Sequence, residues 1–333
     1  MKAFGFAATA IVALAAASPA QQPAPAAPSR IDRTDPALDA LIAPDAKVER
    51  VATGFTFTEG PLWHQGKLWF SDVNGDKLRT VDRQGNVVEL LDNSGGLPNP
   101  PKGKSIGSNG LVPAADGKVL MAQMGARRIV KVDATGKVTP FVDRLDGKRL
   151  NSPNDMVYAP DGSLWITDPP FGLFNGMDKD PAKELPFNPV LRYANGKLTA
   201  PITDLVLPNG IGLSPTGDTL YIADFGQATI FAYPMAPGGK LGARRTVFTF
   251  PKEPGGGADG LKVDKRGNIW ATGPGGVWIM TADGKQLGRI RLPEVAANLA
   301  FGEGGNALWI TASTSVYRVP IKGVGMLPRF AKQ

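Results

Sequence analysis

A short apolar strand motif recurs six times along the chain. Each copy follows a turn and carries an aromatic residue or leucine at its second position, as in GKLWFSD and GSLWITD. The copies lie 39 to 56 residues apart. A repeat of this length, in which every unit is strand-like, is typical of a β-propeller. We expect the repeated residues to pack as core between blades: Trp69, Leu120, Trp165, Tyr221, Trp270 and Trp309.

A second, outer hairpin follows most copies, as in RIVKVDATGKVTPFV, with a D-x-x-G or N-G turn between its strands. The last copy is followed by SVYRVPIKG and little else, so its blade lacks an outer strand. Residues 47–55, KVERVATGF, can supply that strand, and pairing the chain ends would leave no exposed sheet edge. The pattern predicts an all-β, six-bladed β-propeller without ordinary helices. Residues 171–189 are too long for a tight turn, and we expect them to form a lid over one face.

The N-terminal part has a different character. One positive charge at Lys2, an apolar run over residues 4–17 and small residues at 18–20 are the layout of a secretory signal peptide. The apolar run is shorter than the roughly 20 residues that span a bilayer. We therefore expect export to the periplasm or outside the cell, without a membrane span; an Ala-rich frayed terminus is the alternative. The expected division is residues 1–20 as signal peptide, 21–34 as Pro/Ala-rich linker and 35–333 as propeller domain.

Composition excludes several kinds of site. The chain has no cysteine, which rules out disulfides, thiolate nucleophiles and zinc–thiolate sites. Its single histidine, His64, rules out a multi-histidine metal site, and we expect this residue to point to solvent from a hairpin turn. The formal net charge of +7 is spread along the chain, so no nucleic-acid partner is indicated. The sequence gives no sign of an obligate protein partner.

Polar residues occupy positions before the repeated strands where packing would favour apolar ones. In four blades such a residue lies 10 to 12 positions before the repeated aromatic residue, so four side chains can converge on the propeller axis. Two carboxylates and two amide oxygens suit a hard divalent cation. The alternative is that these residues cap turns beside glycine. The predicted metal ligands are Glu59, Asn154, Asn209 and Asp259, and Asn109 lies at the same depth in a fifth blade.

Four segments resemble the gluconolactonase branch of the regucalcin (senescence marker protein)/gluconolactonase family: TEGPLW, GKRLNSPNDMVYAPDGSLWITDPPFGL, LPNGIGLSPTGDTLYIAD and ADGLKVDKRGNIW. The resemblance covers about residues 51–309. It implies a six-bladed propeller with one catalytic divalent cation in its channel, calcium first, with magnesium, manganese or zinc as alternatives. In this resemblance Glu59, Asn209 and Asp259 match metal ligands, whereas Asn154 and Asn109 match residues that meet substrate, Asn154 at or next to the metal. The animal regucalcins have a sugar-contacting arginine where this chain has Ser152, so the particular lactone stays open.

The resemblance implies hydrolysis of a sugar lactone, glucono-1,5-lactone or a related aldonolactone, to the aldonic acid. A cation at the lactone carbonyl would stabilise the oxyanion, and Asp259, or else Glu59, would act as the base. One alternative is a related propeller hydrolase acting on other esters or phosphotriesters, as in paraoxonases and diisopropyl fluorophosphatase. Another is a non-catalytic propeller that binds a ligand.

Overall fold

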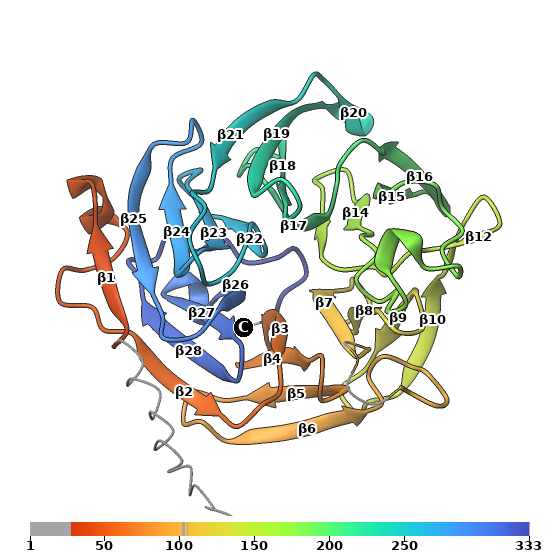
Figure 1. Cartoon of the computed structure of the whole chain (residues 1–333). Helices are drawn as coiled ribbons and strands as arrows, with labels where there is room; N and C mark the ends of the chain where they lie inside the picture. The colour runs from red at the N-terminus through yellow and green to blue at the C-terminus, as the bar shows by residue number, and fades with distance from the viewer. Residues whose placement is uncertain (1–27, 102–103, 105, 333) are drawn as a thin grey trace, which may run out of the picture.

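The computed structural model describes residues 28–101, 104 and 106–332. Six antiparallel sheets surround a central channel (Figure 1), which confirms the predicted all-β, six-bladed propeller. The helices of the described residues are short 3₁₀ turns, and none is long and apolar enough to cross a membrane. The expected signal peptide and residues 21–27 of the expected linker lie outside the described residues.

Each blade has its innermost strand at the channel and its outermost strand at the rim (Figure 1). Blade one comprises β3 (Thr58–His64), β4 (Lys67–Asp72), β5 (Lys77–Val81) and β6 (Val87–Asp92). Blade two comprises β7 (Ser108–Pro113), β8 (Val119–Gln123), β9 (Arg128–Val132) and β10 (Val138–Val142). Blade three comprises β13 (Met156–Tyr158), β14 (Leu164–Thr167), β15 (Val190–Ala194) and β16 (Lys197–Ile202).

Blade four comprises β17 (Pro208–Leu213), β18 (Thr219–Asp224), β19 (Thr229–Ala236), β20 (Lys240–Leu241) and β21 (Arg245–Thr249). Blade five contains β22 (Leu261–Val263), β23 (Ile269–Gly273), β24 (Gly276–Met280) and β25 (Gln286–Arg291). Blade six contains β26 (Ala296–Gly302), β27 (Ala307–Ala312) and β28 (Ser315–Pro320). The remaining elements are the hairpin β11 (Arg144–Leu145) and β12 (Lys148–Arg149), and the 3₁₀ turns η1 (Pro36–Ala40), η2 (Met177–Lys179), η3 (Pro237–Gly239) and η4 (Glu303–Gly305).

The two ends of the chain close the ring. Strand β2 (Glu49–Thr53) pairs antiparallel with β28, with Arg50 opposite Tyr317 and Ala52 opposite Val316. This confirms that the segment predicted from residues 47–55 completes the last blade. β2 thereby becomes the outermost strand of blade six, and a propeller closed in this way holds its channel residues in fixed positions.

The start of the body differs from the expected linker. Residues 30–33 form β1 (Arg30–Arg33), which adds a fifth strand to blade five by pairing with β25. The Asp32 carboxylate accepts a hydrogen bond from Arg291, and the Arg33 guanidinium donates to the Ala43 carbonyl oxygen at 2.6 Å. Leu38 in η1 is fully buried in the core of blades five and six. This strand directly follows the Pro/Ala-rich stretch, and its partner strand lies about 260 positions away, so the local sequence did not indicate it.

The six repeated residues form the predicted core. All of them are at most 4% exposed. Trp270 packs edge-on against Phe301 of the next blade, with ring centroids 5.6 Å apart. Trp309 of blade six stacks on Trp63 of blade one at 5.3 Å, across the junction where the ring closes. Burial of large aromatic side chains at blade interfaces is what fixes the relative orientation of neighbouring sheets.

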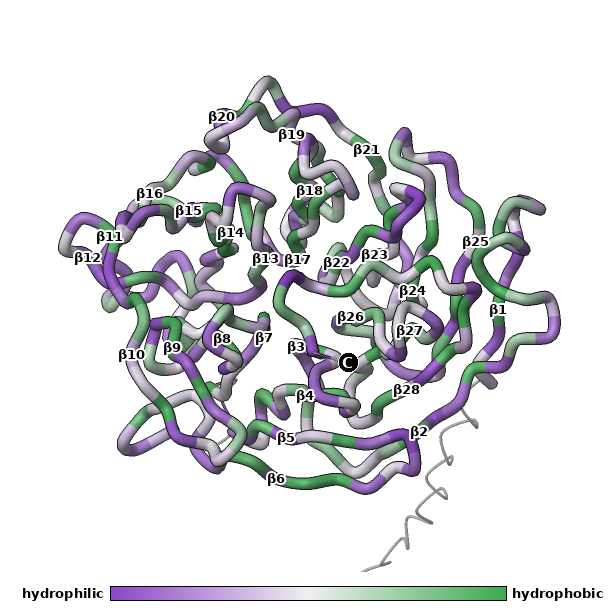
Figure 2. The backbone as a smooth tube through the Cα atoms, turned by 180° about the vertical axis from the view of Figure 1, so that it is seen from behind, coloured by the Kyte–Doolittle hydropathy of each residue, from purple (hydrophilic) through white to green (hydrophobic). Residues whose placement is uncertain are grey.

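The C-terminal segment, residues 322–332, crosses the face seen in Figure 2 and ends beside β3. Along its path the Arg329 guanidinium donates to the carbonyl oxygens of Ala159 and Pro160 in blade three, at 3.1 and 2.8 Å. The Lys332 carbonyl then accepts from the Gln65 backbone in blade one at 2.9 Å. The segment therefore ties together blades one and three, which are not neighbours in the ring.

His64 is not the solvent-facing turn residue that we expected. It ends β3, is 1% exposed, and its Nδ1 accepts a hydrogen bond from the Lys332 backbone N–H at 3.3 Å. Its ring meets Trp69 edge-on at 5.9 Å. Burial lowers the pKa of His64, with a further lowering from the Lys332 charge. The prediction failed because the residue that covers His64 comes from the opposite end of the chain.

Candidate functional site

The five predicted site residues lie at one level of the channel, at the start of five inner strands. Glu59, Asn109 and Asn209 belong to β3, β7 and β17, and Asn154 and Asp259 each lie two residues before β13 and β22. Neighbouring members are tied by backbone bonds from Gly110 N–H to the Asn154 carbonyl at 2.7 Å, and from Gly210 N–H to the Asp259 carbonyl at 2.9 Å. These links bring the predicted residues together in a ring around the axis.

A glycine follows most ring residues and allows this close approach. A Cβ atom on Gly60 would lie 1.9 Å from the Asn109 carbonyl oxygen, and one on Gly110 would lie 2.3 Å from that of Asn154. On Gly210 it would lie 2.3 Å from the Asp259 carbonyl oxygen. These contacts are backbone contacts that cannot yield, so only glycine fits where inner strands converge. The E-G, N-G and D-G pairs in the sequence are thus packing requirements of the ring and not turn signals.

Hydroxyl groups on the second strands hold the ring from behind. Ser71 Oγ of blade one donates to the Asn109 carbonyl oxygen of blade two at 2.8 Å. Thr167 Oγ1 of blade three donates to the Asn209 carbonyl oxygen of blade four at 2.7 Å. Because each bond crosses from one blade to the next, the positions of the ring backbones are set by neighbouring blades together. Such support is what a preorganised site needs.

A sixth ring residue, Asn298 in β26, was missed by the sequence reasoning. Its Nδ2 donates to the Glu59 carboxylate at 3.0 Å, while its Oδ1 accepts from its own neighbour, the Leu299 backbone N–H, at 2.8 Å. Asn298 lies 11 residues before Trp309, which is the depth of the other ring residues. The signal was therefore present in the sixth blade. Its occupied oxygen makes Asn298 a positioning partner of Glu59 and not a candidate ligand.

The ring contains buried oxygens without hydrogen-bond partners. They are the side-chain Oδ1 atoms of Asn109, Asn154, Asn209 and Asp259. Burying such groups unpaired costs free energy, and natural structures rarely leave them so without a bound species to satisfy them. Within the described part of the chain no three His, Asp or Glu side chains gather as a metal cluster, so a cation here would depend on amide oxygens. Carboxylate and amide oxygens are the donors that hard divalent cations prefer, and the residues fit such a cation.

The surroundings of the two ring carboxylates favour their neutral, protonated forms. Burial raises the pKa of Glu59 to about 7, although the hydrogen bonds from Gly60 N–H at 2.6 Å and from Asn298 act to lower it. Burial, with the nearby Glu59 charge, raises the pKa of Asp259 well above its ordinary range. Both shifts describe the ring without a cation. A positive charge between the two carboxylates would reverse them.

Residues 171–189, the insertion, lie beside the ring in blade three. The insertion contains η2, and its Gly172 N–H donates to Ser152 Oγ at 2.7 Å. Ser152 is itself buried, and its backbone N–H donates to the Asp168 carboxylate at 2.7 Å. Burial raises the pKa of Asp168 to about 7. The Ser152 hydroxyl is therefore engaged in anchoring the insertion next to Asn154.

The channel continues beyond the ring into a cavity of about 280 Å³. Its lining is mostly apolar and includes Pro61, Leu111 and Ile211, each two residues beyond a ring residue, together with Met326 and Leu327 of the C-terminal segment. Lys262, which also lines the cavity, forms an ion pair of 2.9 Å with Asp155. The C-terminal segment thus forms a wall of the channel at the end opposite the insertion.

Comparison with known proteins agrees with this architecture. The model of the SMP-30/gluconolactonase/LRE-like family matches residues 57–314. The chain belongs to this family. A gluconolactonase from Zymomonas mobilis is 35% identical over 312 residues, covering 89% of this chain and 87% of that protein. The family match at residues 57–314 includes all six ring residues.

Solved structures of similar fold include members of the same family. A gluconolactonase from Xanthomonas campestris has a TM-score of 0.77 at 32% identity, covering 90% of this chain and 99% of the other. A regucalcin from Agrobacterium tumefaciens, described as a calcium-binding protein, has a TM-score of 0.67 at 21% identity, covering 86% of this chain and 98% of the other. The second likeness concerns the fold. The family anticipated from the four sequence segments is confirmed.

Proposed function

We propose that this gluconolactonase-like lactonase hydrolyses glucono-1,5-lactone or a related aldonolactone to the aldonic acid, with one divalent cation held in the ring. The observation that carries the proposal is the set of buried, unpartnered oxygens of three asparagines and Asp259, together with the buried Glu59 carboxylate, in the channel. The 35% identity to a gluconolactonase over most of both chains supports the substrate class.

Glu59, Asn154, Asn209 and Asp259 would hold the cation, and calcium suits four oxygen donors of this kind. When bound, the cation would polarise the lactone carbonyl and stabilise the negative charge that develops on its oxygen. Asn109 presents its free Oδ1 at the same level, where it can accept a hydrogen bond from a substrate hydroxyl. Its amide donates to Met124 Sδ at 3.2 Å, which fixes the direction of that oxygen.

Asp259 is the better candidate for the base. Glu59 is 2% exposed, and its Oε2 already accepts from Gly60 and Asn298. Asp259 is partly exposed as a residue and follows the more open Gly255–Gly257 segment, and its Oδ1, although buried, has no hydrogen-bond partner. A base must reach both water and the reacting carbon, so the less enclosed carboxylate is favoured. Ester hydrolysis then consumes one water, whose proton passes to Asp259 and on to the leaving alkoxide.

The test is acid release from glucono-1,5-lactone by purified protein, corrected for spontaneous hydrolysis, before and after chelation. Activity that disappears with chelator and returns with calcium supports the proposal. Hydrolysis of diisopropyl fluorophosphate without lactone hydrolysis would favour the phosphotriester alternative. Lactone binding by calorimetry without turnover would favour a non-catalytic propeller.

A further inference from the structure

Large apolar side chains are exposed around the ring end of the channel. Val206, Phe225 and Val295 are 48%, 38% and 37% exposed. Val206 and Val295 each lie three residues before a ring residue, and Phe225 directly follows β18. They are therefore next to the ring, on blades four and six. Exposed apolar residues that gather at one place mark a binding surface more often than scattered ones do.

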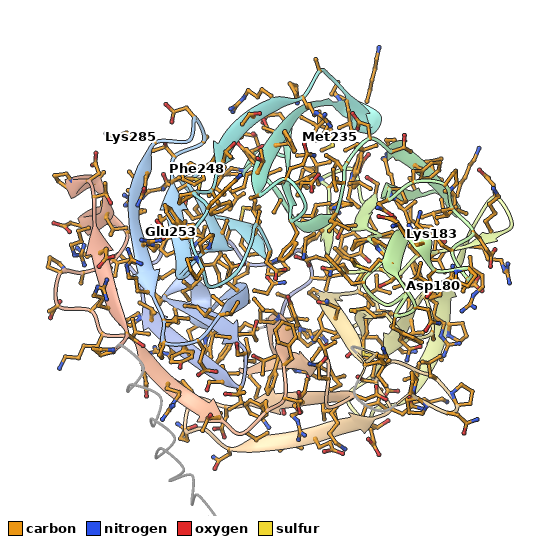
Figure 3. All side chains as sticks on the ribbon, in the orientation of Figure 1. Asp180, Lys183, Met235, Phe248, Glu253 and Lys285 are labelled. Atoms are coloured by element: carbon orange, nitrogen blue, oxygen red, sulfur yellow. The ribbon has the colours of Figure 1, made fainter. Side chains whose placement is uncertain are left out.

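These side chains belong to one continuous surface. Phe171 of the insertion meets Phe225 edge-on at 6.0 Å. Gly257 lies so close to Phe225 that an added Cβ would be 2.7 Å from its ring, and a Cβ on Gly256 would be 3.2 Å from Val295. The glycine segment that leads to Asp259 thus lies between the phenylalanine and the valine. In Figure 3, Glu253, which precedes the glycine segment, and Lys183 of the insertion lie on opposite sides of the centre of the molecule.

The surface is held in place by buried polar groups. The Asp224 carboxylate, fully buried, accepts hydrogen bonds from the backbone N–H groups of Val206 at 2.9 Å and Leu207 at 3.0 Å. Phe225 follows Asp224 directly, so one carboxylate fixes both segments. Ser152 holds the insertion through Gly172, next to Phe171. The apolar residues are therefore positioned by the same kind of support as the ring.

We propose that Phe171, Val206, Phe225 and Val295 form an apolar collar that selects lactones carrying an alkyl substituent on the carbon bonded to the ring oxygen. The inference rests on the proposed function. With the carbonyl at the ring of oxygens, a substituent on the far side of the lactone would point out of the channel, where the collar lies. Each methylene of an alkyl group that is buried there should strengthen substrate binding about fourfold. Glucono-1,5-lactone carries a hydroxymethyl group at the same carbon, which offers the collar a single methylene and can keep its hydroxyl in the solvent that reaches these exposed side chains.

The experiment compares kcat/KM for glucono-1,5-lactone, δ-valerolactone and δ-nonalactone, whose butyl group extends the valerolactone ring. In the wild type we expect δ-nonalactone to exceed δ-valerolactone by at least tenfold. Phe225→Ala should lower the δ-nonalactone value about tenfold, mainly through KM, and change the other two less than threefold. Phe225→Leu should restore most of the loss. Val88→Ala, which removes a 46% exposed valine from outer strand β6, is the matched control and should change nothing.

The outcomes separate the two proposals. A wild type inert toward all three lactones refutes the proposed function and the collar with it. A wild type that hydrolyses lactones without favouring the butyl group refutes the collar alone. A Phe225→Ala protein whose kcat/KM falls by the same factor on every substrate also refutes the collar, because an equal loss indicates general damage to the site. Circular dichroism and the melting temperature of each variant exclude misfolding as the cause.

Discussion

In chelator, the protein's stability should fall as pH rises, and added calcium should cancel that fall. The reason lies in Glu59, which is buried and whose pKa is raised from 4.5 to about 7 in the empty ring. Below pH 4.5 the carboxyl is protonated in both folded and unfolded chains and adds no pH dependence. Between pH 4.5 and 7 the folded chain holds a proton that the unfolded chain has lost, so the free energy of unfolding decreases with pH. Above pH 7 the decrease is complete.

The size of the effect follows from the same shift. A pKa raised by about two and a half units corresponds to a loss on the order of 3 kcal/mol between pH 4.5 and 7. Asp259 adds to it in the same direction, since its pKa is also raised. Asp168 acts in the same sense, with a pKa of about 7, but it lies outside the ring. Calcium at one hundred times its dissociation constant would return about 2.7 kcal/mol.

The assay is urea unfolding between pH 5 and 8, in chelator and in excess calcium. We expect calcium to stabilise the protein much more at pH 8 than at pH 5, where protons compete for the carboxylates. Glu59→Gln keeps an oxygen acceptor for Gly60 and Asn298 without the charge. This variant should be more stable than the wild type in chelator at pH 8, and calcium should stabilise it little. Asp168→Asn is the control, because it should flatten part of the pH dependence and keep the calcium response.

Two results would contradict this reasoning. Equal calcium stabilisation at pH 5 and 8 would mean that the cation does not compete with protons at these carboxylates. A Glu59→Gln protein that responds fully to calcium would place the cation elsewhere.

Further predictions concern the site and the chain ends. Asp259→Asn should lower kcat by roughly 10²-fold or more, without rescue by calcium. Asn209→Ala should bind calcium at least about tenfold more weakly and should be partly rescued by excess calcium. An active Asp259→Asn protein with unchanged calcium affinity would mean that the site has been misplaced. Gly110→Ala should lose about 1–3 kcal/mol of stability, visible in urea unfolding, because its Cβ would strike the backbone of the next ring residue. His64→Ala should keep lactonase activity but melt earlier in calorimetry, since its contact with the C-terminal segment is lost. We also propose export, for which intact-mass measurement of the exported protein should find a start near Gln21, and retention of residues 1–20 would refute it.

The repeat along the chain was sufficient for the fold because each blade buries its own marker residue. Trp165 and Trp270, both fully buried, lie at positions that local pattern alone can identify. The ring residues could be predicted for a similar reason, because an equal number of residues before the repeated core residue means an equal depth along an inner strand. Asn298 satisfied that criterion and was overlooked because no carboxylate or glycine accompanied it.

Features that depend on distant partners could not be predicted. His64 is buried by Lys332, and β1 is ordered by β25, so in both cases the deciding contact joins segments far apart in the sequence. The collar is a stronger example. Phe171 and Phe225 are 54 positions apart, and nothing in either local sequence indicates that their rings meet. Loops that converge over a channel acquire their common surface only when the ring has closed.

The two ends of the channel are unequal, and this bears on how a substrate reaches the ring. At one end the C-terminal segment is fastened to blades one and three by backbone and guanidinium bonds, and Met326 and Leu327 wall the cavity beneath. Entry there would require breaking those bonds. At the other end lie the half-buried Asp259 and the exposed Phe225. A lactone that arrives from this side passes the collar before its carbonyl reaches the oxygens, so the residues that select its substituent and those that act on its ester bond contact one molecule at the same time.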